Sequence, residues 1–583
     1  MGTSEPVEIE WQFDALDLRP VERWLATLPT LSLEADDQRT ITALAKTPRR
    51  LVDSYVDTDD WRMAGAGFVV RTRRRGRHDE VTLKDTRAAE ESGLRRRLEV
   101  TETLPPAGVG ALGPDGPVGR RVHAIAGRRR LSEVLEVRTR RRPFSLRVGG
   151  VDAAEVSLDD TVVVVGSGHR PLHLRRVEVE VLPEWVDALE PIVAQLRSSC
   201  GLQPATLSKF EAGLLAVGVE IPGPPDLGGT EVSPDATMGE LAYAVLRRQL
   251  AVLRQKEPGT RLGEDPEDLH DMRVATRRLR AALDLFADIL PVRARSYRDE
   301  LGWVASVLGA VRDLDVQQEG LGEMATALVD WGMLLGDGSH DPLADLADLL
   351  DRERDAARSA MLAGLDSARW ERLVNGMAAL VRQGPLRRSV ATRSPAVIGV
   401  PDLVVARHDA VVQAARKAKK SGQAADFHRL RKRCKKLRYS LEFSSELYAG
   451  RTARYIRRLT VLQDRLGLMQ DAEVAAGRLA DLATGQAHLP SSTVFVMGGV
   501  AAHHRRNVAR FLRRLPKDVS RVGGREWKDL TSIMERRRSQ ALTAPVPAPR
   551  ALTAVPMPET LPETEPAPRV ATLVPPPASG QGE

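Results

Sequence analysis

The feature that most constrains the fold of this chain is a repeat in its C-terminal half. The segment LHDMRVATRRLRAALDL, which begins at Leu269, aligns with FHRLRKRCKKLRYSLEF, which begins at Phe427, at an offset of 158 residues (427 − 269). Further along, LGAVRDLDV from Leu308 aligns with LGLMQDAEV from Leu466 at the same offset. Because two separate segments share one offset, the sequence predicts two related helical halves that face each other.

Both copies of the first segment have the pattern of an amphipathic helix. Apolar residues at spacings of three and four predict a buried face, which consists of Met272, Ala275, Leu279, Ala282 and Phe286 in the first copy and Leu430, Cys434, Leu437 and Leu441 in the second. At about 100° per residue, the opposite face carries a basic stripe, which we expect to point outward. The first stripe is His270, Arg273, Arg277 and Arg280, and the second stripe is His428, Arg431, Lys435 and Arg438.

The two stripes favour an anionic partner over a merely solvated surface. A solvated helical face normally mixes both charges, whereas these stripes are nearly free of acidic residues and bring like charges together. Aromatic residues make up only 4% of the chain, and proteins that bind single-stranded nucleic acids normally stack the bases on aromatic side chains. A polyanion without bases therefore fits better than nucleic acid, which stays an alternative together with a purely structural scaffold.

The repeated segments resemble the CHAD family, the conserved histidine α-helical domain, over residues 236–520. This resemblance implies an all-α domain made of two four-helix-bundle halves. It also implies that the domain binds inorganic polyphosphate along its basic surface, with both stripes as the binding residues, and that the protein associates with polyphosphate granules.

The N-terminal part of the chain alternates apolar and charged residues with a period of two, which is typical of β-strands. In VEIEWQF the alternation places Glu8, Glu10 and Gln12 on one face, and RRVEVEVL does the same for Glu178 and Glu180. The segments between them alternate basic residues instead, namely Arg71, Arg73, Lys84, Arg95 and Arg97. Spacing alone leaves two interpretations open: a half-exposed antiparallel sheet, and a closed barrel whose lumen holds acids for a divalent cation and bases for phosphates.

Residues 5–217 resemble the CYTH domain of the triphosphate tunnel metalloenzymes. The matching motifs are Glu8-x-Glu10, Tyr55-x-Asp57-Thr58, Arg71-x-Arg73, Thr82-x-Lys84, Arg97-x-Glu99, Asp159, Glu178-x-Glu180 and Ser208-Lys209. The resemblance implies an eight-stranded antiparallel tunnel that binds Mg²⁺ or Mn²⁺ together with tripolyphosphate or a nucleoside triphosphate. It assigns the metal to Glu8, Glu10, Asp159, Glu178 and Glu180, and the triphosphate to Arg71, Arg73, Lys84, Arg97 and Lys209.

The same resemblance implies a metal-dependent inorganic triphosphatase with Glu8, Glu10, Gln12 and Lys84 as its catalytic residues. The chain departs from the family pattern at Gln12, where the motif has lysine, and in the last strand, which reads Arg176-x-Glu178-x-Glu180 where an additional glutamate is often found. Met63 stands at the position of the motif leucine. Losing one cation weakens hydrolysis more than binding, because phosphoryl transfer depends on positioning and charge stabilisation. Two functions therefore stay open: an active triphosphatase, and a non-catalytic scaffold of polyphosphate granules with a degenerate CYTH domain.

The remaining sequence features concern domain organisation and location. Residues 218–235 are rich in Pro and Gly and predict a linker, and the proline-rich residues 541–583 predict a disordered tail. The two cysteines are too few for a cysteine-based zinc site, and no run approaches the roughly 20 apolar residues of a membrane span. We therefore expect a cytoplasmic α+β multidomain protein without a membrane partner.

Overall fold

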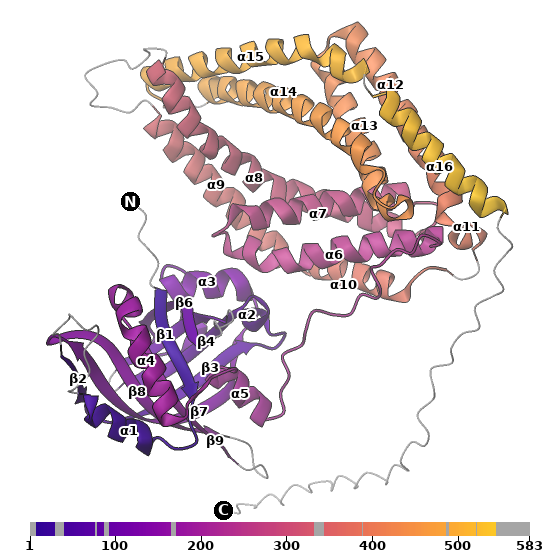
Figure 1. Ribbon diagram of the computed structural model, residues 1–583. Helices are drawn as coiled ribbons and strands as arrows, with labels where there is room; N and C mark the ends of the chain where they lie inside the picture. The colour runs from indigo at the N-terminus through magenta and orange to yellow at the C-terminus, as the bar shows by residue number, and fades with distance from the viewer. Residues whose placement is uncertain are drawn as a thin grey trace, which may run out of the picture.

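The chain folds into an N-terminal β-domain and a C-terminal helical domain, joined by an extended segment (Figure 1). The computed structural model describes residues 7–28, 40–75, 78–86, 93–164, 171–330, 343–386, 389–485, 489–520 and 522–543. The predicted α+β multidomain organisation is confirmed, and the segment 218–235 contains no helix or strand. Of the residues predicted as a disordered tail, 541–543 form the end of a helix, and the others lie outside the described residues.

Eight antiparallel strands close into a barrel, which confirms the predicted tunnel and excludes the half-exposed sheet. In order around the wall these are β1 (Val7–Asp14), β6 (Leu94–Thr103), β5 (His78–Asp85), β4 (Phe68–Arg75), β3 (Arg49–Thr58), β7 (Leu131–Val148), β8 (Val151–Val164) and β9 (Leu172–Val181). The ring closes because β9 pairs with β1, with Val179 opposite Trp11. Two further strands extend the sheet, β2 (Ile41–Ala45) on β7 and β10 (Gln203–Pro204) on β1.

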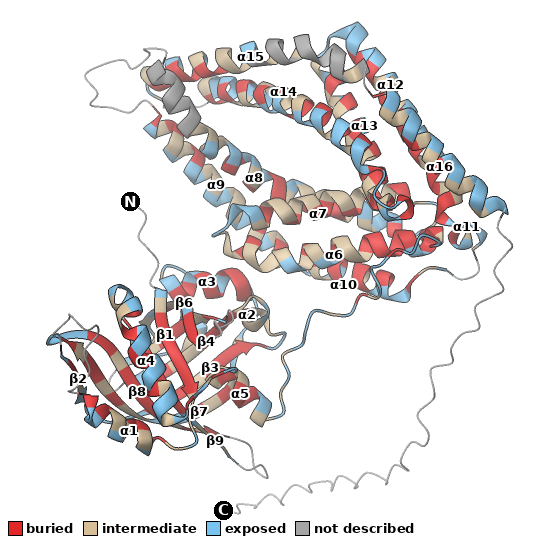
Figure 2. Cartoon of the chain, in the orientation of Figure 1, coloured by how far each residue is buried: buried red, intermediate tan, exposed pale blue. Residues whose placement is uncertain are grey.

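The barrel strands turn their apolar side chains outward and their polar side chains inward. Trp11 and Phe13 of β1 are buried in one outer core with Leu189, and Leu83 of β5 is buried in another with Val122. Figure 2 shows the strands largely buried. The helices that supply these outer contacts are α1 (Arg19–Ala26), α2 (Arg62–Gly65), α3 (Pro117–Ala126) and α4 (Val186–Cys200). The charged residues of the strands are therefore left to face the lumen.

A short helix, α5 (Lys209–Ala216), closes one end of the lumen with apolar side chains. Its residues Phe210 and Leu214 are buried against inward-facing Tyr55, Val69 and Val137. The helix begins where it does because the Ser208 hydroxyl accepts a hydrogen bond from the amide of Glu211, whose side chain accepts one from the amide of Ser208. This capping box places Lys209 in the first turn, at the floor of the lumen.

The helical domain consists of two halves related by the repeat. The first half contains α6 (Met238–Leu262), α7 (Pro266–Leu285), α8 (Ala294–Asp330), α9 (Ala344–Leu365) and α10 (Ala368–Gln383). After the short α11 (Val390–Arg393), the second half contains α12 (Ala396–Ser421), α13 (Ala424–Phe443), α14 (Ala453–Gly485), α15 (Ser491–Ser520) and α16 (Arg525–Thr543). When the first and last residues of α7 are shifted by the offset of the repeat, they coincide with the first and last residues of α13. Short 3₁₀ turns occur at Val109–Ala111, Pro183–Trp185 and Ser445–Tyr448.

In the described part of the chain each half has a fifth helix beyond the four that were expected. These are α10, which contacts α6, and α16, which contacts α12 in the same way. Residue 520, the predicted end of the domain, therefore precedes a helix that belongs to it. The sequence did not reveal α16 because the basic repeat ends before it, although Leu530 and Met534 are buried in the common core.

Two reciprocal ion pairs connect the halves through α7 and α13. Arg278 of α7 donates to Glu442 of α13 at 2.6 Å, and Lys436 of α13 donates to Asp284 of α7 at 2.9 Å. The offset of the repeat converts one pair into the other, because Arg278 corresponds to Lys436 and Asp284 to Glu442. Two ion pairs related in this way are expected when the two halves are arranged with approximate two-fold symmetry. The predicted facing of the two halves is thus realised through α7 and α13.

We predict that this reciprocal pairing stabilises the helical domain. Alanine substitution of Arg278 and Glu442, singly and together, should give a coupling of about 0.5–1 kcal/mol in the free energy of unfolding, because the pair is partly shielded from solvent. Urea denaturation of the parent and the three variants measures it. The exposed pair Arg525 and Asp529, 3.9 Å apart, is the control and should show almost no coupling. Equal coupling in both pairs would contradict the prediction.

The β-domain contacts the helical domain at the C-terminal end of α6. Leu262 packs against the outer core of the barrel beside α3, and Arg121 of α3 pairs with Glu264 at 2.7 Å. A second pair joins Arg129 to Glu371 of α10 at 3.0 Å. None of the described helices combines the length and the apolarity that crossing a bilayer requires.

Candidate functional site

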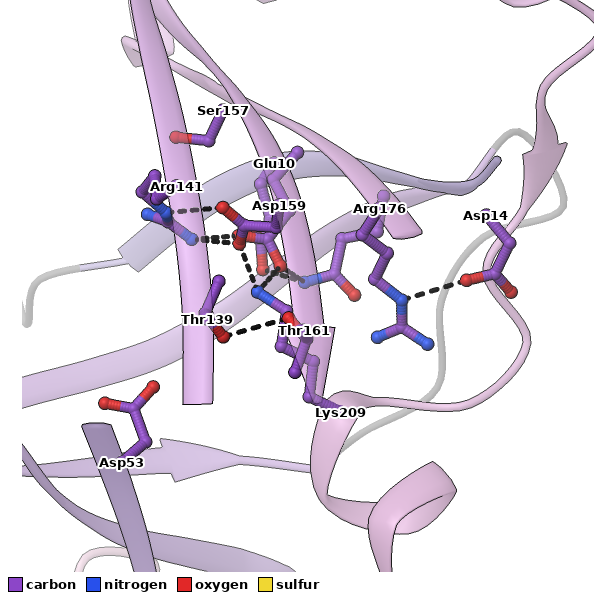
Figure 3. A network of polar contacts seen from close by, with 12 residues as sticks. Glu10, Asp14, Asp53, Thr139, Arg141, Ser157, Asp159, Thr161, Arg176 and Lys209 are labelled. Carbon is purple, nitrogen blue, oxygen red and sulfur yellow. Dashed lines mark hydrogen bonds and ion pairs between the residues drawn. The ribbon is translucent and has the colours of Figure 1, made fainter. Parts of the chain in front are cut away.

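The barrel encloses a cavity of about 300 Å³, which receives side chains from all eight strands of its wall. Ten of the residues predicted for the tunnel line it, namely Glu8, Glu10, Gln12, Arg71, Arg73, Lys84, Arg97, Glu178, Glu180 and Lys209. Asp159, also predicted, is fully buried beside them and contacts Arg141 and Lys209 (Figure 3). The fold therefore brings together the predicted acids and bases of distant segments.

Carboxylates from three neighbouring strands form a row on one side of the cavity. In the strand register, Glu10 of β1 lies opposite Glu180 of β9, which in turn lies opposite Glu155 of β8. Burial first, and then the nearby Glu8, raise the pKa of Glu10 above its ordinary value, and partial desolvation in the cavity wall followed by Glu8 does the same for Glu180. Because like charges in opposite positions repel each other, this row favours a bound cation.

Lys84 and Arg97 neutralise the carboxylates at the start of this row. The Lys84 ammonium lies 2.8 Å from Glu8 and 2.7 Å from Glu99, while Arg97 contacts Glu8 at 3.3 Å and also pairs with Glu10. Burial opposes the ionisation of Glu8, but Lys84 and Arg97 nevertheless lower its pKa to about 2. Burial raises the pKa of Glu99 to about 7, against the attraction of Lys84. Glu8 therefore carries its charge at any physiological pH.

A second network lies toward the α5 end of the lumen (Figure 3). Arg141 donates two hydrogen bonds to Asp159, at 2.8 and 2.7 Å, and one to Glu178 at 2.5 Å. Lys209 pairs with the same two carboxylates, at 2.9 Å from Glu178. Lys209 and Arg141 are the nearest cations that lower the pKa of the buried Glu178. In the next part of the wall, Arg73 makes a two-pronged contact with Asp53 at 2.6 and 2.8 Å.

Gln12 lies between the two networks. Its amide nitrogen donates to Glu10 at 2.8 Å and points to Glu178 at 3.5 Å. The side chain is only 4% exposed, and its carbonyl oxygen has no hydrogen-bond partner among the described residues. A neutral amide thus bridges two carboxylates at this point.

The donor set of the cavity suits a hard divalent cation, although the carboxylates are occupied by basic side chains. Glu8, Glu10, Glu178 and Glu180 offer only oxygen ligands, which Mg²⁺ and Mn²⁺ prefer. Among the described residues, no three or more His, Cys, Asp or Glu side chains are arranged as a metal site. Glu180 makes no ion pair with a described residue and is exposed at the wall of the cavity. A metal ion would therefore have to replace the basic partners of the other carboxylates.

The two stripes of the helical domain lie on contacting helices and are half-buried. All eight stripe residues are partly exposed, and the apolar faces of both helices are buried as predicted, with Leu279 and Cys434 at 0% exposure. The expected fully outward stripe is therefore wrong, because the helix that follows in each half lies beside it. A Cβ atom at Gly309 would lie 3.6 Å from Arg273, and one at Gly467 would lie 3.2 Å from Arg431. The first distance is an ordinary contact and the second is tighter, so both arginines lie close to the following helix, α8 or α14.

The stripes act on each other electrostatically and form one merged basic surface. Burial, together with Arg277 of α7 and Arg431 of its own helix, lowers the pKa of Lys435 to about 7. Burial also lowers the pKa of Arg277, and Arg273 and Arg438 add to the effect. The acids that pair with this surface include the exposed Asp313 at 3.2 Å from Arg273, the exposed, repeat-related Asp471 at 3.7 Å from Arg431, and the half-buried Glu442 at 3.2 Å from Arg438. The balance of charge thus favours an anion.

Comparison with known families assigns both domains. Residues 27–213 match the CYTH domain, and residues 244–480 match the CHAD domain. The chain is a CYTH–CHAD protein. Strand β1, which carries Glu8 and Glu10, precedes the matched part of the CYTH domain, yet it completes the barrel. The CYTH domain relates this chain to triphosphatases and to triphosphate-binding tunnel proteins.

Solved structures resemble each domain separately. The CHAD domain from the plant Ricinus communis is 27% identical, covers 51% of this chain and 96% of its own, and has a TM-score of 0.41. PptA from Streptomyces chartreusis is 22% identical, covers 48% and 99%, and has a TM-score of 0.39. HpAC1 from Hippeastrum, described as a putative adenylyl cyclase with a dominant triphosphatase activity, is 18% identical, covers 37% and 98%, and has a TM-score of 0.28. The comparison with curated proteins returned no match.

Several residues of the CYTH cavity were absent from the predicted site. These are Asp53, Arg95, Glu99, Arg141 and Glu155. The alternation of AEVSLDD places Glu155 and Asp159 on one face, and Glu99 follows Arg97 by two, so a strict period-two count would have included both glutamates. Arg141 lies within a run of arginines, where the sequence does not show which one points inward.

Proposed function

We propose that this CYTH–CHAD protein binds inorganic polyphosphate on its merged basic surface, and that its tunnel binds triphosphate and hydrolyses it with a divalent metal. The observation that carries the proposal is the closed lumen, in which buried arginines and lysines alternate with a row of carboxylates. Phosphoryl transfer needs both parts, because cations must hold the phosphate oxygens while carboxylates hold a metal.

In this proposal the basic residues of the tunnel exchange their carboxylate partners for phosphate. Arg71, Arg73, Lys84, Arg97 and Lys209 are the predicted triphosphate ligands. Guanidinium groups bind carboxylate and phosphate oxygens in the same two-pronged geometry, so an exchange preserves their hydrogen bonds. Arg141 joins this set, because it already spans Asp159 and Glu178.

The carboxylates released by this exchange would hold Mg²⁺ or Mn²⁺. Glu8, Glu10, Glu178 and Glu180 are the residues for this role, and Glu155 extends the row. Asp159 suits it less, because it is fully buried beside the cavity and does not line it. When bound, such a metal neutralises phosphate charge and orients the attacked group. The place where hydrolysis would occur is surrounded by the four predicted catalytic residues, Glu8, Glu10, Gln12 and Lys84. Of these, Gln12 contributes no charge.

Substitutions in the cavity should distinguish the residues that hold the metal from the residues that contact phosphate. We predict that Glu180→Ala removes metal-dependent phosphate release from tripolyphosphate, whereas Gln12→Lys increases it, because a lysine adds a charge-assisted contact to the substrate. Phosphate release is measured with Mg²⁺ and with Mn²⁺. Glu190→Ala, on the exposed face of α4, is the control. Full activity in Glu180→Ala would contradict the metal role, and retained tripolyphosphate binding without hydrolysis in every variant would assign the tunnel to binding alone.

The merged basic surface is the proposed site for long polyphosphate. Each stripe spans about 15 Å at 1.5 Å per residue, so its residues can contact successive phosphates of an extended chain. Polyphosphate has no bases, so its binding does not require aromatic side chains for stacking. A bound polyanion of any length would also reduce the repulsion between the two stripes. A partner of this kind agrees with the proposed association with polyphosphate granules.

Charge reversal at Arg273, Arg277, Arg431 and Lys435 to Glu should abolish binding of long polyphosphate and leave helicity intact. The reason is that these residues form the merged basic surface and none belongs to the apolar core. Filter binding measures affinity and circular dichroism measures folding. Reversal of the exposed Arg454, Arg457, Arg525 and Arg536 changes the net charge equally and is the matched control.

The same assay separates polyphosphate from nucleic acid. Polyphosphate should displace double-stranded DNA at equal phosphate concentration, and affinity should fall steeply with salt. If the stripe variant binds as well as its matched control, net charge alone is responsible and the site assignment is wrong. Stronger binding of DNA at physiological salt would favour the nucleic-acid alternative.

Polyphosphate binding should take up protons at pH 8. The pKa of Lys435 near 7 means that folding disfavours its protonated form, so stability rises with pH between about 7 and its ordinary value of 10.5. A bound polyanion favours the charged form, so Lys435 gains a proton. Calorimetry in buffers of different ionisation enthalpy, with long chains that have few end groups, measures the uptake. Lys435→Gln should abolish it, and equal uptake in both proteins would place Lys435 outside the site.

A further inference from the structure

One buried arginine of the CYTH cavity has no acidic partner among the described residues. Arg95 of β6 is 5% exposed and lines the cavity. Every other buried or half-buried basic residue of the lining forms an ion pair, namely Arg71, Arg73, Lys84, Arg97, Arg141 and Lys209. Arg95 instead donates one hydrogen bond to the backbone carbonyl of Ala205 at 2.9 Å, and its Nε has no partner.

The contacts of Ala205 place Arg95 close to Gln12. The amide of Ala205 donates to the backbone carbonyl of Gln12 at 2.9 Å, while the Ala205 carbonyl accepts from Arg95. Arg95 also lies opposite Glu10 in the pairing of β6 with β1. At this point the wall of the lumen therefore contains a buried guanidinium nitrogen and, on Gln12, a buried amide oxygen, neither of which has a hydrogen-bond partner among the described residues.

A buried cation without a counter-ion is unfavourable, because desolvation is not offset by attraction. Burial, and then the like charge of Arg97, lower the pKa of Arg95, and the attraction of Glu10 and Glu211 offsets this only in part. Each of the neighbouring cations in the cavity, in contrast, has a carboxylate within ion-pair distance. An anion that enters the lumen would thus gain more at Arg95 than at a residue whose charge is already neutralised.

We propose that Arg95 binds a phosphate group of the triphosphate and supplies the positive charge that Gln12 lacks at this end of the cavity. The inference rests on the proposed function of the tunnel and adds a specific residue to it. It assigns Arg95 to the substrate because the guanidinium is buried, lines the cavity and retains a free donor.

A structural role for Arg95 can be distinguished by comparison with Arg176. Arg176 also donates to the backbone of the segment before α5, at Leu207, and it is 1% exposed. Unlike Arg95, it pairs with an acid, Asp14, at 3.0 Å. Holding the segment in place therefore does not require an arginine without a counter-ion, and Arg176→Met is the control for that role.

The test measures tripolyphosphate binding by calorimetry in the full-length chain, with Gln at Arg273, Arg277, Arg431 and Lys435 so that only the tunnel responds. We expect Arg95→Met to weaken binding roughly tenfold to a hundredfold, the size of one charge-assisted hydrogen bond. Adding Gln12→Lys to Arg95→Met should restore most of the affinity, because it returns a cation to the same place. The exposed neighbour Arg96→Met should leave binding unchanged.

Each of the following results either supports or overturns the proposed role of Arg95. Loss in Arg95→Met with rescue by Gln12→Lys, and little loss of affinity in Arg176→Met, supports the proposal. Unchanged affinity in Arg95→Met overturns it, and so does a loss that Gln12→Lys fails to rescue, because a residue that only holds the segment cannot be replaced by a charge on β1. If the parent chain does not bind tripolyphosphate at all, the proposed function fails and this inference fails with it. Thermal denaturation of each variant detects unfolding.

Discussion

The compensation of buried charge is the constraint on which the CYTH domain depends. Its strands give their apolar faces to the surrounding helices, so the charged faces have nowhere to lie but the lumen. A charge that is taken out of water there is costly without a partner, and among the described basic residues buried in the lining only Arg95 lacks an ion pair. The pairs of Lys84 with Glu8, Arg73 with Asp53, and Arg141 with Asp159 provide such partners. The same pairs make the cavity responsive, because an entering phosphate or metal competes for charges that are already held in position.

The CHAD domain treats charge in the opposite way. Its apolar faces are buried between helices, and its basic residues collect where the two halves meet, beside the exposed Asp313 and Asp471 and the half-buried Glu442 and Asp284. The reciprocal pairs of Arg278 with Glu442 and Lys436 with Asp284 hold α7 and α13 together at this place. They attract, whereas Lys435 and Arg277 repel across the same contact. A polyanion bound at this surface would reduce that repulsion and leave the apolar core unchanged. The fold can therefore tolerate the cluster of like charges.

Much of this architecture follows from the sequence, because periodicity reports directly on burial. The period of two predicted strands with Glu8, Glu10 and Lys84 on their polar faces, the resemblance to the CYTH domain predicted that these strands close into a barrel, and the repeat predicted the relation of α7 to α13. What the sequence could not predict was position in three dimensions. Alternation does not show that Glu155 stands opposite Glu180, since strand register depends on the whole barrel. Likewise, the repeat relates the stripes without revealing that neighbouring helices half-bury them.

One helical hairpin joins the tunnel domain to the first of the two basic stripes. The C-terminal end of α6 contacts the barrel through Leu262, and Glu264 in the following turn pairs with Arg121. The next helix, α7, begins at Pro266 and carries the first stripe. A second contact between the domains, the pair of Arg129 with Glu371, lies on α10. The turn between α6 and α7 thus joins the barrel to the helix that pairs with α13 across the two halves.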